Sequence, residues 1–216
     1  VINPSASTCT GSGRSLSLVT RFRDEHISDN LITWTPAWNE ALREDRHIFT
    51  ACATWSVKFS IESSDPQQKN LGRWGLMSAP EGNANLGGTS MGITKTCKDK
   101  RLAWEFLKFA TLSTEGARTL NSMGLMTTAK KPYEEDPSLK SYKSRWFGNQ
   151  DLGIYYMDHI IPSIKTRTLT SQDGVIHECL WMILNALNRD GNLSSEEAEE
   201  LLREELQKEL KDITVY

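Results

Sequence analysis

The sequence contains no long hydrophobic run and no strong excess of charge. No apolar stretch approaches the ~18 residues that a membrane-spanning helix needs. The 25 basic and 28 acidic residues give a net charge of −3, which argues against nucleic-acid binding because nucleic-acid-binding proteins carry a basic surface. With 38% hydrophobic and 25% charged residues, the composition is globular and excludes disorder and collagen-like repeats.

Metal-binding and redox motifs are absent as well. The four cysteines, Cys9, Cys52, Cys97 and Cys179, lie far apart in the sequence, so no CxxC motif exists. The four histidines are equally scattered. We therefore expect no metal and no cofactor, and we interpret the cysteines as small buried side chains. Disulfides remain open, since four cysteines allow three pairings and the spacing does not choose among them.

The first residues lack the parts of an export signal. The chain begins at Val1 without a methionine, a basic segment or an apolar segment. Residues 1–13 are rich in Ser, Thr, Gly and Pro, which is typical of a loop. We expect the sequence to be a piece of a longer protein.

Most of the chain has the spacing of amphipathic helices. The periodicity predicts helices over 14–27, 37–45, 99–112, 113–124, 151–161 and 173–188. A last helix should begin at Ser194, because Ser194 and Glu197 have the spacing of a capping box. Segments 72–79 and 90–96 have the composition of strands, and segment 47–59 has that of a strand or of a junction between a strand and a helix. These strands are too few for a self-contained parallel sheet, so we predict a helix-rich α/β fold with an incomplete sheet.

A serine hydrolase is one interpretation of the segment at 88–92. It matches G-x-S-x-G with Ser90 as the nucleophile, and Asp173 and His177 follow in the order of a catalytic triad. A nucleophile elbow needs a strand before the serine and a helix directly after it. Here a loop rich in Gly and Asn precedes Ser90, and β-branched residues follow it. The hydrolase is therefore an alternative to a binding protein.

Seven tryptophans are many for 216 residues. We assign Trp104 and Trp181 to the core, because they lie in amphipathic helices. Trp55, Trp74 and Trp146 lie in or beside loops with small and amide side chains. An exposed indole there can stack on the apolar face of a sugar ring. Ordinary packing is the alternative for each of these three.

Six short segments, in order along the chain, are similar to motifs of one protein family. They are ATW at 53–55, GLMSAP at 75–80, GGTSMGI at 87–93, KDK with AWEFLKF at 98–109, STEG at 113–116 and WFGNQD at 146–151. From Asp45 onward the chain resembles the C-terminal half of the family 1 extracellular solute-binding proteins. These are the maltose-binding-protein-like carbohydrate receptors of ABC importers.

The resemblance implies a partial type II periplasmic-binding-protein fold, in which two α/β lobes enclose a ligand. Residues 1–70 would form the first part of the C-terminal lobe. Residues 71–127 would be a hinge crossing and a segment of the N-terminal lobe, and residues 128–216 would complete the C-terminal lobe. The first half of the family pattern would be missing, which would explain the shortage of strands. The faces left by that half could drive dimerisation.

The resemblance implies capture of a sugar by lobe closure, without catalysis. The protein would be a cell-surface lipoprotein or a periplasmic receptor that serves the membrane subunits of an ABC importer. Trp55 matches the stacking tryptophan of the family. Gly87, Gly88 and Thr89 match a loop at the cleft edge, where glycine lets backbone amides approach a ligand. Further candidate ligand contacts are Asp173, Trp146 and Trp34. A protein-interaction module without a small-molecule ligand is a third interpretation.

Overall fold

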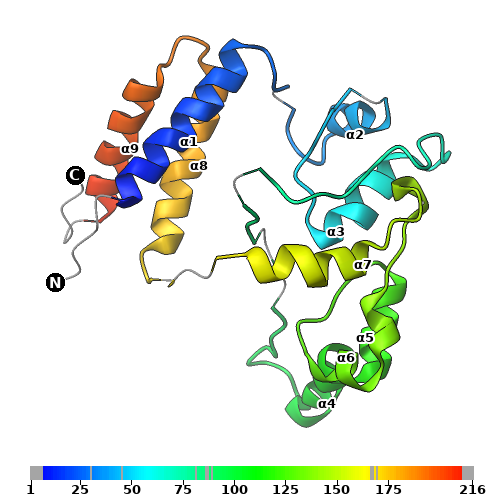
Figure 1. Ribbon diagram of the computed structural model, residues 1–216. Coiled ribbons are helices and arrows are strands. Elements are labelled where there is room, and N and C mark those ends of the chain that lie inside the picture. The colour runs from blue at the N-terminus through cyan, green and yellow to red at the C-terminus, as the bar shows by residue number, and fades with distance from the viewer. Residues whose placement is uncertain are drawn as a thin grey trace. The chain divides into compact units, whose positions relative to one another are not determined.

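The computed structural model describes residues 7–29, 31–44, 46–80, 82–85, 88, 90–165, 168 and 170–210, with side chains from residue 13 onward. The chain divides into two compact units. Unit 1 consists of Val1–Leu31 and Arg167–Tyr216, and unit 2 consists of Ile32–Thr166. Figure 1 shows the elements of both units in the colours of the chain.

Unit 1 is a bundle of three helices from the two ends of the chain. Helices α1 (Ser7–Asp24), α8 (Asp173–Arg189) and α9 (Ser195–Glu209) contact one another pairwise and lie together in Figure 1. Their shared core consists of Leu16, Cys179, Ile183, Leu187, Ala198 and Leu202. The three predicted helices of this unit are confirmed. The prediction of a loop up to residue 13 is wrong for the stretch from Ser7, where α1 begins.

Side chains form hydrogen bonds with the free backbone groups at the helix ends of unit 1. The Ser194 hydroxyl accepts the N–H of Glu197 (3.2 Å), and the Glu197 carboxylate accepts the N–H of Ser194 (2.9 Å), so the predicted capping box is confirmed. The Arg23 guanidinium of α1 donates to three carbonyl oxygens at 2.9–3.2 Å, those of Leu187, Asp190 and Leu193. Carbonyls at a helix C-terminus lack partners within the helix. Arg23 therefore joins α1 to the turn between α8 and α9.

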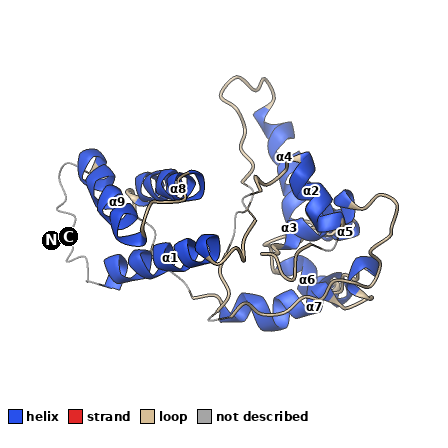
Figure 2. Ribbon diagram, turned by 90° about the horizontal axis from the view of Figure 1, so that it is seen from above, coloured by secondary structure: helices blue, strands red, loops and turns tan. Residues whose placement is uncertain are grey.

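Unit 2 is a set of short helices connected by long loops (Figure 2). Its α-helices are α2 (Pro36–Arg43), α3 (Thr54–Ser56), α4 (Lys100–Leu112), α5 (Thr114–Ser122), α6 (Lys131–Glu135) and α7 (Leu152–Tyr155). Two π-helices, η1 (Val57–Glu62) and η4 (Tyr156–Ile160), directly continue α3 and α7. The 3₁₀ turns are η2 (Pro137–Lys140), η3 (Arg145–Phe147) and η5 (Ile161–Ser163). The core of the unit consists of Val57, Ile61, Leu76, Phe147, Leu152 and Tyr156.

The described residues form no β-strand, and their only bridge is an isolated one between Lys143 and Asp151. The strands predicted at 72–79 and 90–96 are therefore wrong, and of the junction predicted at 47–59 only the helical part is found. The α/β class predicted from these segments is not found in the described residues. Segment 47–59 enters α3 at Thr54 and continues into η1. Segment 90–96 is irregular and ends in a turn before α4. A strand needs a neighbouring strand to bond with, and the described residues form none beside either segment.

Segment 72–79 has half of the hydrogen bonding of a strand. The N–H groups of every second residue point to one neighbouring stretch, residues 145–155. The bonds join Gly72 to the Arg145 carbonyl (2.9 Å), Trp74 to the Trp146 carbonyl (3.0 Å), Leu76 to the Gln150 side chain (2.8 Å) and Ser78 to the Tyr155 hydroxyl (3.1 Å). An alternation of period two is that of an extended chain. Two of the four acceptors are side chains, so no ladder forms.

Several side chains expected in the core are exposed. Trp104 on α4 is 51% exposed and Trp181 on α8 is 62% exposed, so their assignment to the core is wrong. Helix α4 has no buried residue, although its existence was correctly predicted. Among the described cysteines, Cys179 is buried, Cys52 and Cys97 are half-buried, and all three are free thiols. The side chain of Cys9 lies outside the described part.

Candidate ligand-binding site

Three tryptophan rings of unit 2 gather in one cluster. The ring centroids of Trp34 and Trp55 lie 5.6 Å apart with planes at 26°, which is a stacked pair. Trp38, on α2, lies 5.7 Å from Trp34 with its plane tilted by 53°. Trp34 is 54% exposed, while Trp38 and Trp55 are half-buried. We call Trp34, Trp38 and Trp55 the tryptophan cluster.

A tight turn before α2 fixes Trp34 in an unusual backbone conformation. Its φ of +71° is in the left-handed region, which tryptophan rarely adopts. The N–H and the hydroxyl of Thr35 both donate to the Ile32 carbonyl, at 3.2 and 2.7 Å. The Thr35 hydroxyl in turn accepts the N–H of Trp38 (3.3 Å) and caps α2, and Pro36 follows at the first helical position. The contacts that start the helix therefore also stabilise the strained backbone conformation of Trp34.

The backbone on both sides of Trp55 is fixed by contacts with the core of unit 2. It lies in α3, and its neighbours Ser56 and Val57 are 6% and 1% exposed. The Tyr156 hydroxyl donates to the carbonyl of Cys52, three residues before Trp55 (2.9 Å). Burial, and then the nearby Cys52 thiol, raise the pKa of Tyr156, so its hydroxyl stays protonated as a donor. The hydrogen bond fixes the backbone that leads into α3.

The tryptophan cluster presents an aromatic surface. The C–H face of a sugar ring can pack on an indole while its hydroxyls bond to water or polar groups. Trp34 already covers one face of Trp55 at 5.6 Å. A ligand ring can therefore stack on the outer face of Trp34, or displace Trp34 and stack on Trp55.

Sequence reasoning selected Trp34 and Trp55 but not their contact, and it did not select Trp38. The spacing of Trp34 and Trp38 is four residues, which within a helix would place them on one face. The Thr35–Pro36 pair, a typical helix start, signals instead that Trp34 precedes the helix. That start was the available signal that Trp34 could fold back over Trp38.

Trp146 has a different environment. Its indole N–H donates to the carboxylate of Asp65 (3.0 Å), and its ring packs against the core of unit 2. Asp65 is 1% exposed and also accepts the N–H groups of Lys69 (3.0 Å) and Asn70 (2.8 Å). Burial alone would raise the pKa of Asp65, but these hydrogen bonds hold it below its usual value. The ring contacts of the described residues do not connect Trp146 to the tryptophan cluster.

The glycine loop is only partly described. Gly87 and Thr89 lie outside the described residues. Gly88 is exposed and has a φ of +141°, and a Cβ at this position would meet no atom within 4 Å. Its backbone is thus accessible and has a conformation that favours glycine. The role of this loop in ligand contact stays a prediction.

The remaining candidate residues are divided between the two units. Asp173 begins α8 in unit 1, where its carboxylate accepts the N–H (3.1 Å) and the hydroxyl (3.2 Å) of Thr170. His177 is one turn further along α8 and exposed. Ser90, in unit 2, is exposed in an irregular segment, and the next helix after it begins only at Lys100. The described residues around Ser90 therefore form neither the strand nor the helix of a nucleophile elbow.

The described residues contain neither a cluster of metal-ligating side chains nor a membrane-spanning helix. No group of three or more His, Cys, Asp or Glu side chains there could hold a metal ion. None of the described helices has the length and hydrophobicity required to span a membrane.

The sequence profile of one family, described as bacterial extracellular solute-binding protein, matches residues 10–145. This is more than half of the chain, and the chain belongs to this family. Comparisons with curated proteins and with solved structures give no match. The matched region contains the whole tryptophan cluster and Gly88, and it ends before Trp146 and Asp173.

Family membership supports a solute-binding role outside the cytoplasm. It implies a ligand and transporter partners in general terms, and families of this kind are generally not enzymes. The tryptophan cluster is the feature of the matched region best suited to hold a solute.

Proposed function

We propose that this protein captures a sugar or an oligosaccharide outside the cytoplasm for the membrane subunits of an ABC importer. The observation that carries the proposal is the stacked pair of Trp34 and Trp55 within the region that matches the family. Aromatic rings suit a neutral ligand with apolar faces, and the net charge of −3 offers no strong field for a charged one.

Binding on this proposal needs no chemical step. The sugar stacks on the tryptophan cluster, and the amides of the loop at Gly87, Gly88 and Thr89 approach its hydroxyls. Trp146 in unit 2 and Asp173 in unit 1 stay candidate ligand contacts from the family resemblance, each considered within its own unit. The architecture is the C-terminal half of a type II binding protein, with residues 1–70 and 128–216 in one lobe and 71–127 in the hinge crossing and the other lobe. A lipid anchor at the cell surface, or release into the periplasm, fits this role.

A sugar titration tests the proposal. Mono- and oligosaccharides are added to the protein while tryptophan fluorescence and binding heat are followed. We expect Trp55→Ala to weaken binding about tenfold, because one aromatic stack contributes up to about 1.5 kcal/mol. Trp181→Ala is the matched control, since Trp181 is an exposed tryptophan of unit 1, and it should leave the affinity unchanged. A response to peptides or metal ions with none to sugars would refute the sugar assignment.

Trp34→Ala separates the two ways of stacking. If the ligand rests on the outer face of Trp34, the variant binds about three- to tenfold more weakly. If the ligand must displace Trp34 from Trp55, the variant binds more tightly, because the competing ring has gone. An affinity equal to that of the wild type would show that Trp34 takes no part.

A further inference from the structure

We propose that segment 73–79 pairs with the same segment of a second copy of this chain, through a backbone edge that unit 2 leaves open. In an extended chain, successive residues direct their N–H and C=O groups to opposite edges. The even-numbered amides of this segment bond to residues 145–155, as described above. The odd-numbered residues therefore face the other edge.

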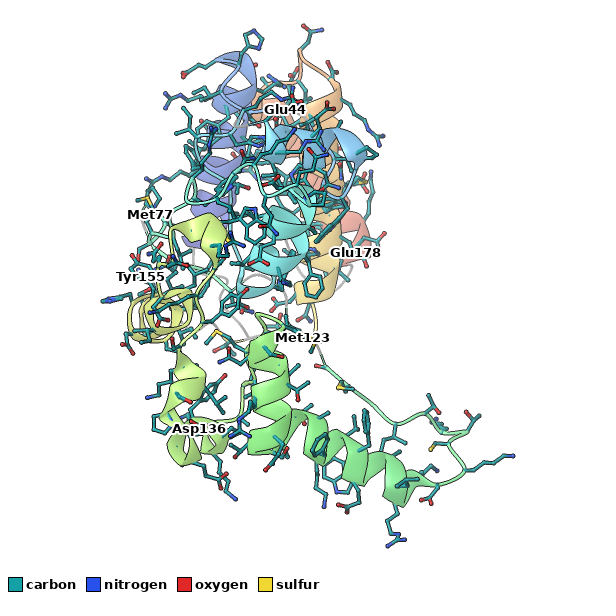
Figure 3. All side chains as sticks on the ribbon, turned by 90° about the vertical axis from the view of Figure 1, so that its right-hand side faces the viewer. Glu44, Met77, Met123, Asp136, Tyr155 and Glu178 are labelled. Atoms are coloured by element: carbon teal, nitrogen blue, oxygen red, sulfur yellow. The ribbon has the colours of Figure 1, made fainter. Side chains whose placement is uncertain are left out.

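That other edge has free backbone groups. Among the described residues, no hydrogen bond reaches the N–H or C=O of Gly75 or Met77. Gly75 is exposed and Met77 is 70% exposed. Figure 3 shows Met77 close to Tyr155, whose hydroxyl accepts the N–H of the next residue, Ser78. An exposed row of unpaired backbone groups is a template for another strand.

The open edge is symmetric about Leu76. On one side of it the N–H of Arg73 bonds to the Asn70 carbonyl (3.3 Å), and on the other the N–H of Ala79 bonds to the Asn83 side chain (2.9 Å). The free groups are thus confined to the residues directly before and after Leu76. A two-fold axis at Leu76 pairs such an edge with itself, which is the isologous geometry of most dimers.

Pairing about Leu76 also brings complementary side chains together. Antiparallel pairing about Leu76 places Gly75 opposite Met77 of the second copy, as a pair that exchanges both backbone hydrogen bonds. Two such pairs give four hydrogen bonds. The exposed Met77 side chain then covers Gly75 of the second copy, where a Cβ would meet no atom within 4 Å. A large apolar side chain thus meets an empty position on both sides of the axis.

The contact is short. It covers far less than the ~1,200 Å² of a stable interface, so we expect a weak dimer in rapid exchange. Amide hydrogen exchange measured by NMR from micromolar to millimolar protein should detect it. The amides of Gly75 and Met77 should become protected as the concentration rises, while those of Trp74 and Leu76 are protected throughout. Absence of any concentration dependence at Gly75 and Met77 would overturn the proposal.

Variants test the proposed pairing about Leu76. Analytical ultracentrifugation gives the dissociation constant of the dimer for each of them. Met77→Pro removes one of the two free donors from each copy and should weaken the dimer about tenfold or more. Ala84→Pro, in the exposed loop that follows, is the matched control and should dimerise as the wild type does. Protected amides at Trp74 and Leu76 in Met77→Pro would show that unit 2 is still folded.

Met77→Lys covers the case in which the proline variant does not fold. This variant keeps the N–H group but places a charge over Gly75 of the second copy, and it should weaken the dimer severalfold. Dimerisation unchanged in a folded Met77 variant would refute the pairing. None of these residues belongs to the tryptophan cluster, so the outcome is independent of sugar binding.

Discussion

At the scale of single residues, Asp65 is a buried carboxylate that binds the indole of Trp146 and the backbone that directly follows Asp65 in the sequence. Its carboxylate accepts three N–H groups, from the Trp146 indole and from the backbone of Lys69 and Asn70. The donors favour the ionised form and together lower the pKa of Asp65 in spite of burial. Asp65 therefore stabilises the folded state only while it is ionised.

Asp65→Asn tests this role. The amide has no charge, and in either orientation its NH2 group faces at least one of the three N–H groups, so we expect a loss of about 2–3 kcal/mol of unfolding free energy at pH 7. Asp158→Asn is the matched control, because Asp158 is an exposed carboxylate of the same unit. Urea unfolding followed by tryptophan fluorescence gives both values. Equal stability of the two variants would contradict the role of Asp65.

The contribution of Asp65 to the free energy of unfolding decreases as the pH falls. Because the folded pKa lies below the ordinary aspartate value, the contribution of Asp65 is complete above that ordinary value. It is lost as the pH falls from there through the lower folded pKa. The stability gap between wild type and Asp65→Asn should therefore narrow at acid pH. A gap that is constant with pH would show that the lost charge is not the reason for the lower stability of the variant.

Residue composition indicated part of the candidate site. An indole beside a loop suits sugar stacking, which pointed to Trp55, whereas Trp34 was a candidate only through the family resemblance. Their contact depends on a turn at residues 32–35 and on a φ of +71°, neither of which follows from residue type. Trp146 shows the converse, since its loop position suggested exposure while a distant carboxylate binds its N–H. Local sequence shows which side chains can stack but does not show which of them meet.

At the scale of elements, helix starts were the most predictable feature. The capping box of Ser194 and Glu197 uses contacts three residues apart, so the sequence alone contains it. We expect Ser194→Ala to destabilise unit 1 by about 1 kcal/mol, because it leaves the Glu197 N–H without its acceptor. Ser195→Ala, one residue into the helix, is the matched control and should change stability by less than about 0.5 kcal/mol. Urea unfolding followed by helical circular dichroism measures both, and equal effects would contradict the cap.

Strand predictions failed because a strand depends on a distant partner. Runs of β-branched and aromatic residues fit a pleated, half-buried surface, but they do not supply the neighbouring chain. Segment 72–79 finds side chains of Gln150 and Tyr155 where a strand would offer carbonyls. Segment 47–59 instead turns into α3 and η1, which bury Val57 and Ile61 in the core of unit 2.

At the scale of the whole molecule, the two units have separate cores. The core of unit 1 combines α1 with α8 and α9, which are more than 140 residues further along the chain. Helical periodicity identified the apolar faces of these helices, but it contains no information on which faces meet. The packing of α1 against α8 and α9 in one bundle could therefore not be predicted from the sequence.

Separate cores lead to a reciprocal prediction for hydrogen exchange. Leu187 in unit 1 and Leu152 in unit 2 are both 0% exposed, so either leucine leaves a cavity when replaced by alanine, at a cost of about 2–5 kcal/mol. Leu187→Ala should speed exchange of the amides in α1, α8 and α9 and leave the protected amides of unit 2 unchanged. Leu152→Ala should do the opposite, so each variant is the control for the other. Faster exchange throughout the chain in either variant would show that the two cores unfold as one cooperative unit.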